Sequence, residues 1–277
     1  MNTWKYYNHA FLPDVAPHEH PNIPLLEKKE IWKEKGNGKA LLARWTSEFD
    51  GPEETNWWYC MKDSPLDLNA MKAKRRYEIK RGKQFFACRV IEPTEYQEEL
   101  FEIQKAAVAS YPEANRYQVD HDQFIEQLKD WKSKRVYGAF DRESNQLCGY
   151  VTMRVYDTYA YLESQKTIPE CEKFQINAAL VCAVLEEFHE KLADDYYIVD
   201  GERNVYHETR FQDYLEKYFG FRKAYCRLHI KYRRGIGCLV KLLYPFRSIL
   251  RRIKKPSIIA KVNGVLFMEE LVRTQKK

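Results

Sequence analysis

Ionisable side chains crowd the end of one apolar run. Residues 196–199, Tyr-Tyr-Ile-Val, predict a buried strand. Four charged or titratable residues follow it, namely Asp200, Glu202, Arg203 and His207. A carboxylate there could accept a proton, an arginine could bind an anionic group, and a histidine titrates near neutral pH. The structural alternative is that Asp200 begins a turn and the others form a polar loop before the next helix.

The totals are those of an ordinary globular protein. The chain has 277 residues, of which 44% are hydrophobic and 31% are charged, and this is enough to bury a core. Its seven cysteines include no C-x-x-C pair, so we expect free thiols in a reducing compartment and no metal. The first residues lack the apolar core of a signal peptide, and no long uncharged apolar run occurs. We therefore expect a cytoplasmic protein.

Positive charge is concentrated at the C-terminal end. The net charge is +6, but residues 233–277 hold 12 Lys and Arg against 2 Asp and Glu, a surplus of +10 that leaves −4 for the remainder. Within 237–255, apolar residues recur at helical spacing with basic residues between them, and Pro245 should kink the helix. This pattern favours contact with an anionic membrane surface, with packing on the body as the alternative. Residues 258–271 predict a second apolar helix, which could dock or dimerise.

The periodicities predict a mixed α/β fold. We expect a loose N-terminal segment, 1–38, and then a β-β-α extension, 39–84, whose helix 67–84 has Gly82 as its C-cap. From Phe85 the predicted order is β-α-α-β-β-β-α-β-α-β, with elements at 85–91, 94–111, 120–133, 135–141, 146–157, 159–165, 175–192, 196–202, 209–220 and 221–233. This order predicts a mixed sheet with helices on both faces over 85–233, followed by a basic helical tail, 234–277.

That order resembles the GNAT superfamily of acyl-CoA-dependent N-acyltransferases. The local match is YLEKYFGFRKAYCRL, residues 214–228, which looks like the helix, Gly-Phe step and last strand that close a GNAT domain. In the family a tyrosine four residues before that glycine protonates the leaving thiolate. Here Glu216 occupies that position, and the candidate acids are Tyr214 and Tyr218 on either side.

The donor loop also departs from the family pattern. GNAT proteins cradle the CoA pyrophosphate with a glycine-rich loop at a helix N-terminus. The equivalent stretch, 166–181, contains no glycine, so the resemblance implies acyl-CoA while the loop for its pyrophosphate is absent. Fem-type aminoacyltransferases and related surface-polysaccharide biosynthesis proteins share the fold, often lack this loop and tend to carry a basic helix before the core domain. The chain is similar to them in both respects, which makes tRNA a possible donor partner.

The resemblance also selects candidate site residues. In this fold the reacting groups meet where two central parallel strands separate, here expected at 159–165 and 196–202. Glu163 and Asp200 are then the leading candidates for the catalytic base, ahead of Glu202 and His207, and Arg203 would bind the acceptor. Further substrate contacts are expected from two tryptophans and from one basic helix, namely Trp57, Trp58, Lys72, Arg75, Arg76, Lys80 and Arg81. A solvated strand position for Glu163 and a solvated helix face for the basic residues are the alternatives.

Two functional hypotheses follow. The first is an acyl- or aminoacyltransferase acting on an amino group of a cell-surface polysaccharide or peptidoglycan precursor, an acceptor that the resemblance alone implies. The second is a non-catalytic GNAT-like binding protein associated with a membrane assembly pathway. The missing glycine loop favours the second hypothesis, and the polar cluster after residue 199 favours the first. Binding of nucleic acid by the basic tail is a third option.

Overall fold

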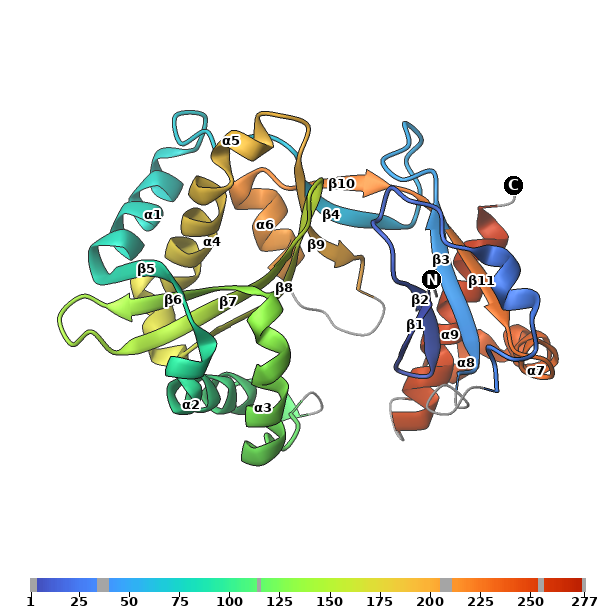
Figure 1. The fold of residues 1–277 in the computed structure, drawn as a ribbon. Helices are drawn as coiled ribbons and strands as arrows, with labels where there is room; N and C mark the ends of the chain where they lie inside the picture. Colours follow the sequence, from blue (N-terminus) through green and yellow to red (C-terminus); the bar gives the residue numbers. More distant parts are fainter. Residues whose placement is uncertain (1–3, 34–39, 114–115, 205–210, 254–256, 276–277) are drawn as a thin grey trace. The chain divides into compact units, whose positions relative to one another are not determined.

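The computed structural model describes residues 4–33, 40–113, 116–204, 211–253 and 257–275, without the side chains of 257 and 258 (Figure 1). The chain divides into two compact units. One comprises Met1–Tyr59, Glu202–Arg210 and Lys223–Lys277, and we call it the terminal unit; the other comprises Cys60–Gly201 and Phe211–Arg222, and we call it the central unit. The sequence predicts four consecutive segments, whereas these units alternate along the chain because strands distant in sequence pair with one another.

A seven-stranded sheet provides the framework of the predicted GNAT-like region. Its strand order is β10-β4-β9-β8-β7-β6-β5. The strands are β4 (Trp58–Lys62), β5 (Phe86–Ile91), β6 (Arg135–Asp141), β7 (Leu147–Val155), β8 (Tyr159–Thr167), β9 (Tyr197–Glu202) and β10 (Arg222–Tyr225). Strands β5 to β8 form an antiparallel meander, and β9 runs parallel to β8. The predicted order and the mixed sheet are therefore confirmed.

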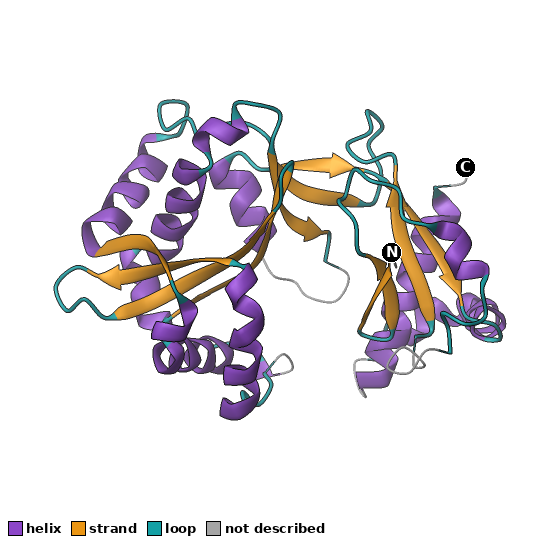
Figure 2. Ribbon diagram, in the orientation of Figure 1, coloured by secondary structure: helices purple, strands orange, loops and turns teal. Residues whose placement is uncertain are grey.

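Helices cover both faces of this sheet (Figures 1 and 2). One face carries α1 (Ala73–Phe85), α4 (Ile176–Glu187) and α6 (Phe211–Phe219), with the short α5 (His189–Leu192) after α4. The other carries α2 (Gln97–Ala109) and α3 (His121–Leu128). Helix α4 is apolar around most of its circumference and has eight buried residues, as expected for a helix enclosed by a sheet and by other helices.

The terminal unit contains a second, four-stranded sheet. Its order is β1 (Trp4–Tyr7), β2 (Ala10–Pro13), β3 (Leu42–Ser47) and β11 (Arg227–Tyr232). Strand β2 runs parallel to β3, whereas β3 pairs antiparallel with β11 over six residues. The predicted strand 221–233 is in fact two strands, because the chain leaves β10 at Cys226, whose N–H bonds the Trp57 carbonyl at 3.0 Å. Helices α7 (Ile236–Leu243), α8 (Arg247–Leu250) and α9 (Ser257–Thr274) complete the unit.

The N-terminal segment is ordered where the sequence predicts a loose one. Its prolines exclude a long helix, but they leave room for β1, β2 and a 3-10 turn at Ile23–Glu27. Trp4, Phe11, Leu26 and Trp32 are buried together in one apolar cluster. Burial of these large side chains supplies the stabilisation that the proline pattern alone does not reveal.

Gly82 lies inside α1 and does not cap it. The helix continues to Phe85, and the Phe86 N–H bonds the Gly82 carbonyl. A Cβ at position 82 would come within 2.6 Å of the Gln175 carbonyl oxygen and 3.1 Å of the Ala179 Cβ. The glycine therefore allows α1 to lie directly against the first turn of α4.

The close contact of α1 with α4 at Gly82 predicts that a methyl group added there lowers stability. We expect Gly82→Ala to lower the free energy of unfolding by about 1–3 kcal/mol, because the two helix backbones must separate. Gly237→Ala is the matched control: it is also a helical glycine, but the new Cβ would meet Tyr232 at an ordinary 3.5 Å, so stability should be unchanged or higher. Urea denaturation of the two variants measures the difference, and equal effects would contradict the packing role of Gly82.

Candidate active site

The parallel strands β8 and β9 pair over only three residues. The partners are Tyr159 with Tyr197, Ala160 with Ile198, and Tyr161 with Val199. Strand β8 then continues to Thr167 and β9 to Glu202, and these described residues pair no further with each other. The strands thus separate at the place where the sequence predicts a reaction site.

Asp200 is the first β9 residue beyond the paired segment. Side chains alternate between the faces of a strand, so Asp200 shares a face with Ile198, which is buried in the core beneath α4 and α6. Gln212 of α6 is buried, and its Nε2 donates to the Asp200 carbonyl oxygen at 3.5 Å. Burial raises the pKa of Asp200 to about 7, against a smaller lowering by a side-chain hydrogen bond from Gln212. At neutral pH this carboxyl group can both accept and release a proton.

Tyr161 lies against the backbone that follows Asp200. Gly201 has a φ of +93°, and a Cβ there would come within 2.6 Å of the Tyr161 hydroxyl. Glycine is therefore required both by the backbone conformation and by the tyrosine. The separation of β8 and β9 thus places the Asp200 carboxyl group and the Gln212 amide together, whereas Tyr161 pairs with Val199 and its side chain lies on the opposite face of the sheet. The sequence analysis identifies only the first of these. The alternation of Tyr161 between buried Ala160 and Leu162 is the one signal that could have drawn attention to the phenol.

Glu163, the other leading base, is held by two cations. Its carboxylate oxygens lie 2.6 Å from Lys134 Nζ and 2.5 Å from Arg154 Nε. Burial opposes ionisation of Glu163, but the bonds from Lys134 and Arg154 outweigh it and hold the pKa of the carboxyl below its usual value. A carboxylate stabilised in this way is a weak proton acceptor. The geometry favours Asp200 over Glu163.

The two tyrosines of α6 belong to a cluster with α1. The Arg75 guanidinium lies 3.6 Å from the centre of the Tyr218 ring and 5.5 Å from that of Tyr214. It also pairs with Glu78 at 2.8 Å, and Arg75 is buried. Burial raises the pKa of Tyr214 well above its usual value. Arg75 is therefore occupied in joining α1 to α6, which corrects its prediction as a substrate contact.

The remaining basic residues of the predicted binding helix have different surroundings. Arg76 donates to the carbonyls of Asn69 and Met71, and Arg81 lies over the Phe85 ring and reaches the Tyr77 hydroxyl at 3.4 Å. Lys72, just before α1, and Lys80 are exposed. A cavity of about 300 Å³ is lined by Leu68, Arg76, Ile79, Lys80, Lys83 and Gln84. Lys80 and Lys72 are thus the members of this group that remain available to an anionic ligand.

Trp57 is buried and Glu202 is half-buried in the terminal unit. Trp57 has no exposed surface, so it cannot stack on a ligand as predicted. Glu202 lies 3.0 Å from the Arg44 guanidinium and accepts a 3.0 Å hydrogen bond from the Tyr59 hydroxyl. Burial and the Glu202 charge raise the pKa of Tyr59 well above its usual value. Glu202 therefore joins β9 to β3 and β4, and this arrangement suits an anchor better than a base.

Arg203 lies over Trp58 within the same unit. The guanidinium carbon is 4.3 Å from the centre of the Trp58 ring, and Lys223 Nζ is 4.4 Å from it. One Arg203 amino group donates to the Asn56 carbonyl at 2.6 Å, and burial lowers the pKa of the arginine. Trp58 is half-buried and flanked by two cations. His207, the last predicted site residue, lies outside the described residues.

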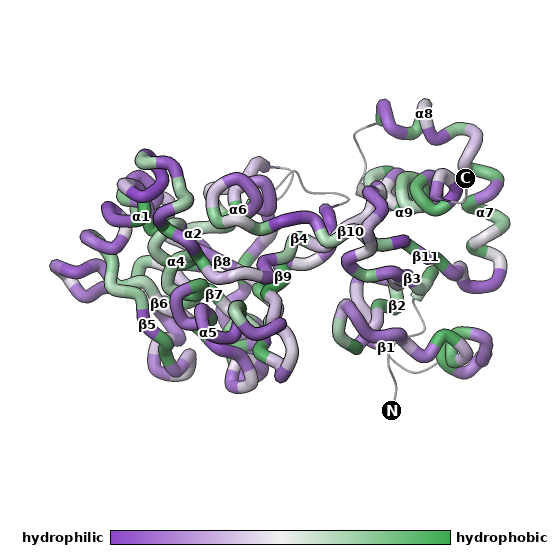
Figure 3. The backbone as a smooth tube through the Cα atoms, turned by 90° about the horizontal axis from the view of Figure 1, so that it is seen from above, coloured by the Kyte–Doolittle hydropathy of each residue, from purple (hydrophilic) through white to green (hydrophobic). Residues whose placement is uncertain are grey.

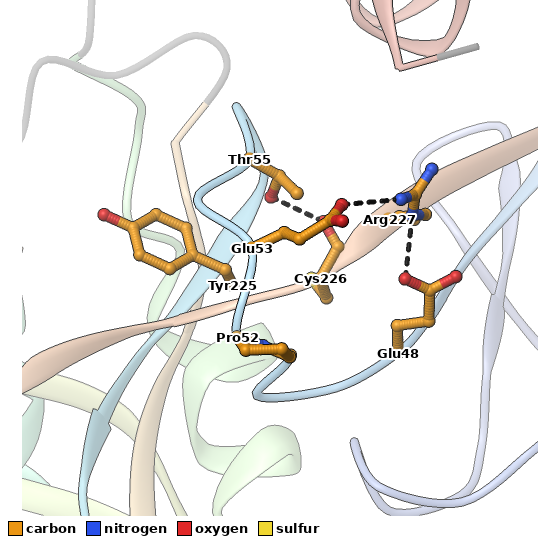
Figure 4. Close-up of a pocket in the computed structure, with 8 residues that line it drawn as sticks. Glu48, Pro52, Glu53, Thr55, Tyr225, Cys226 and Arg227 are labelled. Carbon is orange, nitrogen blue, oxygen red and sulfur yellow. Dashed lines mark hydrogen bonds and ion pairs between the residues drawn. The ribbon is translucent and has the colours of Figure 1, made fainter. Parts of the chain in front are cut away.

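A smaller cavity of about 150 Å³ also lies in the terminal unit (Figure 4). Arg227 spans it, with ion pairs of 2.7 Å to Glu48 and 2.8 Å to Glu53. The Thr55 hydroxyl donates to the Cys226 carbonyl at 2.8 Å. These groups satisfy one another, so the cavity presents no unpaired charge to a ligand.

Neither a metal cluster nor a membrane span occurs in the part of the chain that the structure describes. No three His, Cys, Asp or Glu side chains there are placed to hold a metal ion. No helix among those residues is both long and apolar enough to cross a bilayer.

Comparison with known proteins places the fold. No protein-family model and no curated protein sequence matches the chain. Among solved structures, the C-terminal domain of a putative lysylphosphatidylglycerol synthetase from Agrobacterium fabrum aligns with a TM-score of 0.51 and 11% identity, over 86% of this chain and 82% of that one. L-PGS from Bacillus licheniformis aligns with a TM-score of 0.50 and 12% identity, over 95% and 84% of the two chains. At these identities the likeness concerns the fold alone, which is a mixed α/β fold of GNAT-like architecture.

The pH dependence of stability tests the environment of Asp200. Its folded pKa of about 7 lies above the usual value of an unfolded aspartate, near 4. The folded state therefore disfavours ionisation of Asp200. The contribution of this group to the free energy of unfolding should fall as pH rises from about 4 to 7 and should be constant above pH 7. Between pH 5 and 8 we expect the free energy of unfolding of wild type to fall by about 2–4 kcal/mol. Asp200→Asn should not show this fall. Urea titrations at both pH values measure this, with exposed Asp213→Asn as control; parallel curves for Asp200→Asn and wild type would refute the assignment.

A further stability prediction concerns the half-buried ion pair of Glu202. Replacing Glu202 with Ala leaves the Arg44 guanidinium without its carboxylate, and we expect the free energy of unfolding to fall by about 1–3 kcal/mol. The double variant Arg44→Met/Glu202→Met removes both charges and should recover most of that loss. Chemical denaturation of wild type, the single variant and the double variant gives the comparison. A double variant no more stable than Glu202→Ala would show that the pair is not the source of the effect.

Proposed function

We propose that this protein is an acyl- or aminoacyltransferase in which Asp200 is the general base. The observation that carries the proposal is a carboxyl group with a pKa near 7, placed where β8 and β9 separate in a GNAT-like fold. An amine or hydroxyl nucleophile loses its proton to Asp200 as it attacks the donor carbonyl carbon. The tetrahedral intermediate then collapses, and the leaving group departs and takes up a proton. This proton comes from solvent, because the Tyr161 hydroxyl lies against Gly201 on the face of the sheet opposite Asp200.

An aminoacyl donor suits this chain better than acyl-CoA. The first turn of α4 occupies the place of the glycine-rich loop, and it has no glycine. The Gln175 carbonyl accepts the N–H groups of Ala178 and Ala179, α1 packs against that turn through Gly82, and Ile176 is fully buried. This helix end offers no open cradle for a pyrophosphate. The closeness to Fem-type aminoacyltransferases stays a prediction, and it agrees with this choice of donor.

The acceptor is the open part of the proposal. The sequence implies an amino group on a cell-surface polysaccharide or peptidoglycan precursor, and no described contact selects it. The aligned domain from Agrobacterium fabrum is named for a putative lysylphosphatidylglycerol synthetase, which adds the hydroxyl of a phospholipid head group as a candidate. Both acceptors are nucleophiles that a base of pKa near 7 can assist.

A non-catalytic role is the second candidate. Arg75 holds Tyr214 and Tyr218 against α1, so the α6 tyrosines are engaged in packing while the donor loop is absent. A protein that had lost its donor site would keep the fold and bind a partner instead. Asp200 favours the enzyme, because a carboxyl group whose pKa is raised by its surroundings, and which forms no ion pair among the described residues, lowers stability and is retained more readily where it has a function.

Transfer assays decide between these candidates. Purified protein is incubated with radiolabelled aminoacyl-tRNA or acetyl-CoA, together with a UDP-amino sugar, a peptidoglycan peptide or phosphatidylglycerol vesicles. We expect transfer from aminoacyl-tRNA, with kcat/KM rising with pH to a plateau above about 7 as Asp200 ionises.

A matched pair of variants tests the base itself. Asp200→Asn should lower kcat by at least about 100-fold, whereas Asp213→Asn, an exposed aspartate on α6, should stay near the wild-type rate. Transfer that survives in Asp200→Asn would remove this residue from the mechanism. Absence of transfer from every donor, with folded protein, would establish the binding role instead.

A further inference from the structure

The segment after β11 forms a nearly continuous helical run. Helix α7 leads through a 3-10 turn at Tyr244–Phe246 into α8, so Pro245 tightens the helix locally but does not end the run. One side of the run packs on α9. There Val240 is buried, Arg247 Nε donates to Glu270 at 2.9 Å, and Asn263 Nδ2 donates to the Leu250 carbonyl at 3.0 Å.

The side away from α9 carries a stripe of exposed apolar residues. They are Leu239, Leu242, Phe246, Ile249 and Ile253, each between 40% and 67% exposed. Their spacing of three and four residues places them along one line of a helix. The mixture of hydrophobic and hydrophilic positions along α7 and α8 can be followed in Figure 3. We call these five residues the apolar stripe.

A row of basic residues flanks the apolar stripe. Arg234, Lys241 and Arg252 are exposed and make no side-chain hydrogen bond or ion pair within the described residues. Lys241 lies on α7, at about 100° per residue beside the stripe, and Arg234 and Arg252 lie in the turns just before α7 and just after α8. The only two acidic residues after residue 232, Glu269 and Glu270, are bound to arginines on the packed side. The outer face therefore combines apolar side chains with positive charge alone.

We propose that this face docks on an anionic lipid bilayer surface. Apolar side chains enter the boundary between head groups and acyl chains, while the basic row meets the lipid phosphates. A second copy of the chain would cover the stripe but would bring like charges together. A nucleic acid would match the charges but leave five large apolar side chains in water. Only the bilayer satisfies both features, and the inference holds whether or not the protein is a transferase.

Vesicle binding by the full chain tests the proposal. Wild type is sedimented with phosphatidylcholine vesicles and with vesicles containing one quarter phosphatidylglycerol. We expect binding to the anionic vesicles that is weaker in high salt and on neutral lipid. Lys241→Gln/Arg252→Gln should weaken it by about 30-fold, at roughly a factor of five to ten per basic residue. Leu242→Glu/Ile249→Glu should abolish it.

The control replaces apolar residues of similar exposure elsewhere. Leu41→Glu/Val90→Glu changes side chains that are 42% and 43% exposed and should bind vesicles as wild type does. Circular dichroism confirms that each variant is folded. Equal binding by wild type and Leu242→Glu/Ile249→Glu would overturn the proposal. A second result would also overturn it: light scattering shows a wild-type dimer that Leu242→Glu/Ile249→Glu dissociates, and wild type does not bind vesicles. The apolar stripe would then be covered by a second copy of the chain.

Discussion

The short parallel pairing between β8 and β9 is the constraint on which the candidate site depends. Three residue pairs hold the strands together, and their separation leaves the end of β9 without a partner from β8. A residue at that point is surrounded by core yet lacks a strand neighbour on one side. Asp200 occupies it, and its pKa near 7 follows from desolvation that the hydrogen bond from Gln212 offsets only in part. A longer pairing would have required an ordinary strand residue there.

Three acidic residues that look alike in sequence have different roles because their partners differ. Glu163 lies between Lys134 and Arg154, and these cations stabilise its charge. Glu202 lies between Arg44 and Tyr59, where removal would leave a half-buried cation. Among the described residues, Asp200 is bonded by the Gln212 amide. The balance between burial and pairing therefore separates the three, and it depends on residues that are distant in the sequence.

This dependence sets the limit of what the sequence can reveal. Apolar periodicity is local, and it predicts the order of elements from Phe85 onward, whereas the separation of β8 and β9 is implied by the resemblance to the GNAT fold. The ion pairs of Glu163 and Glu202, and the contact of Tyr161 with Gly201, arise from strand and helix packing, which periodicity does not encode. Gly82 shows the same limit, since a glycine near a helix end suggests a cap unless the neighbouring helix is known. The prediction that Trp57 contacts a substrate is wrong because Trp57 is fully buried. Two adjacent tryptophans give no sign in the sequence of which ring is buried.

The closed start of α4 has a consequence for the donor. In the family that the fold resembles, a helix N-terminus holds the donor phosphates, and the N–H groups there must be open to solvent. Here α1 lies against that turn through Gly82, so a donor has to be held by other groups. Lys72 and Lys80 are exposed on the same helix, and Lys80 lines a cavity of about 300 Å³. Side-chain cations suit a long polyanion better than a compact pyrophosphate, because each can meet a separate phosphate. Lys80 on α1 and Lys72 just before it are thus the exposed cations that would contact the donor under the proposed transfer from aminoacyl-tRNA.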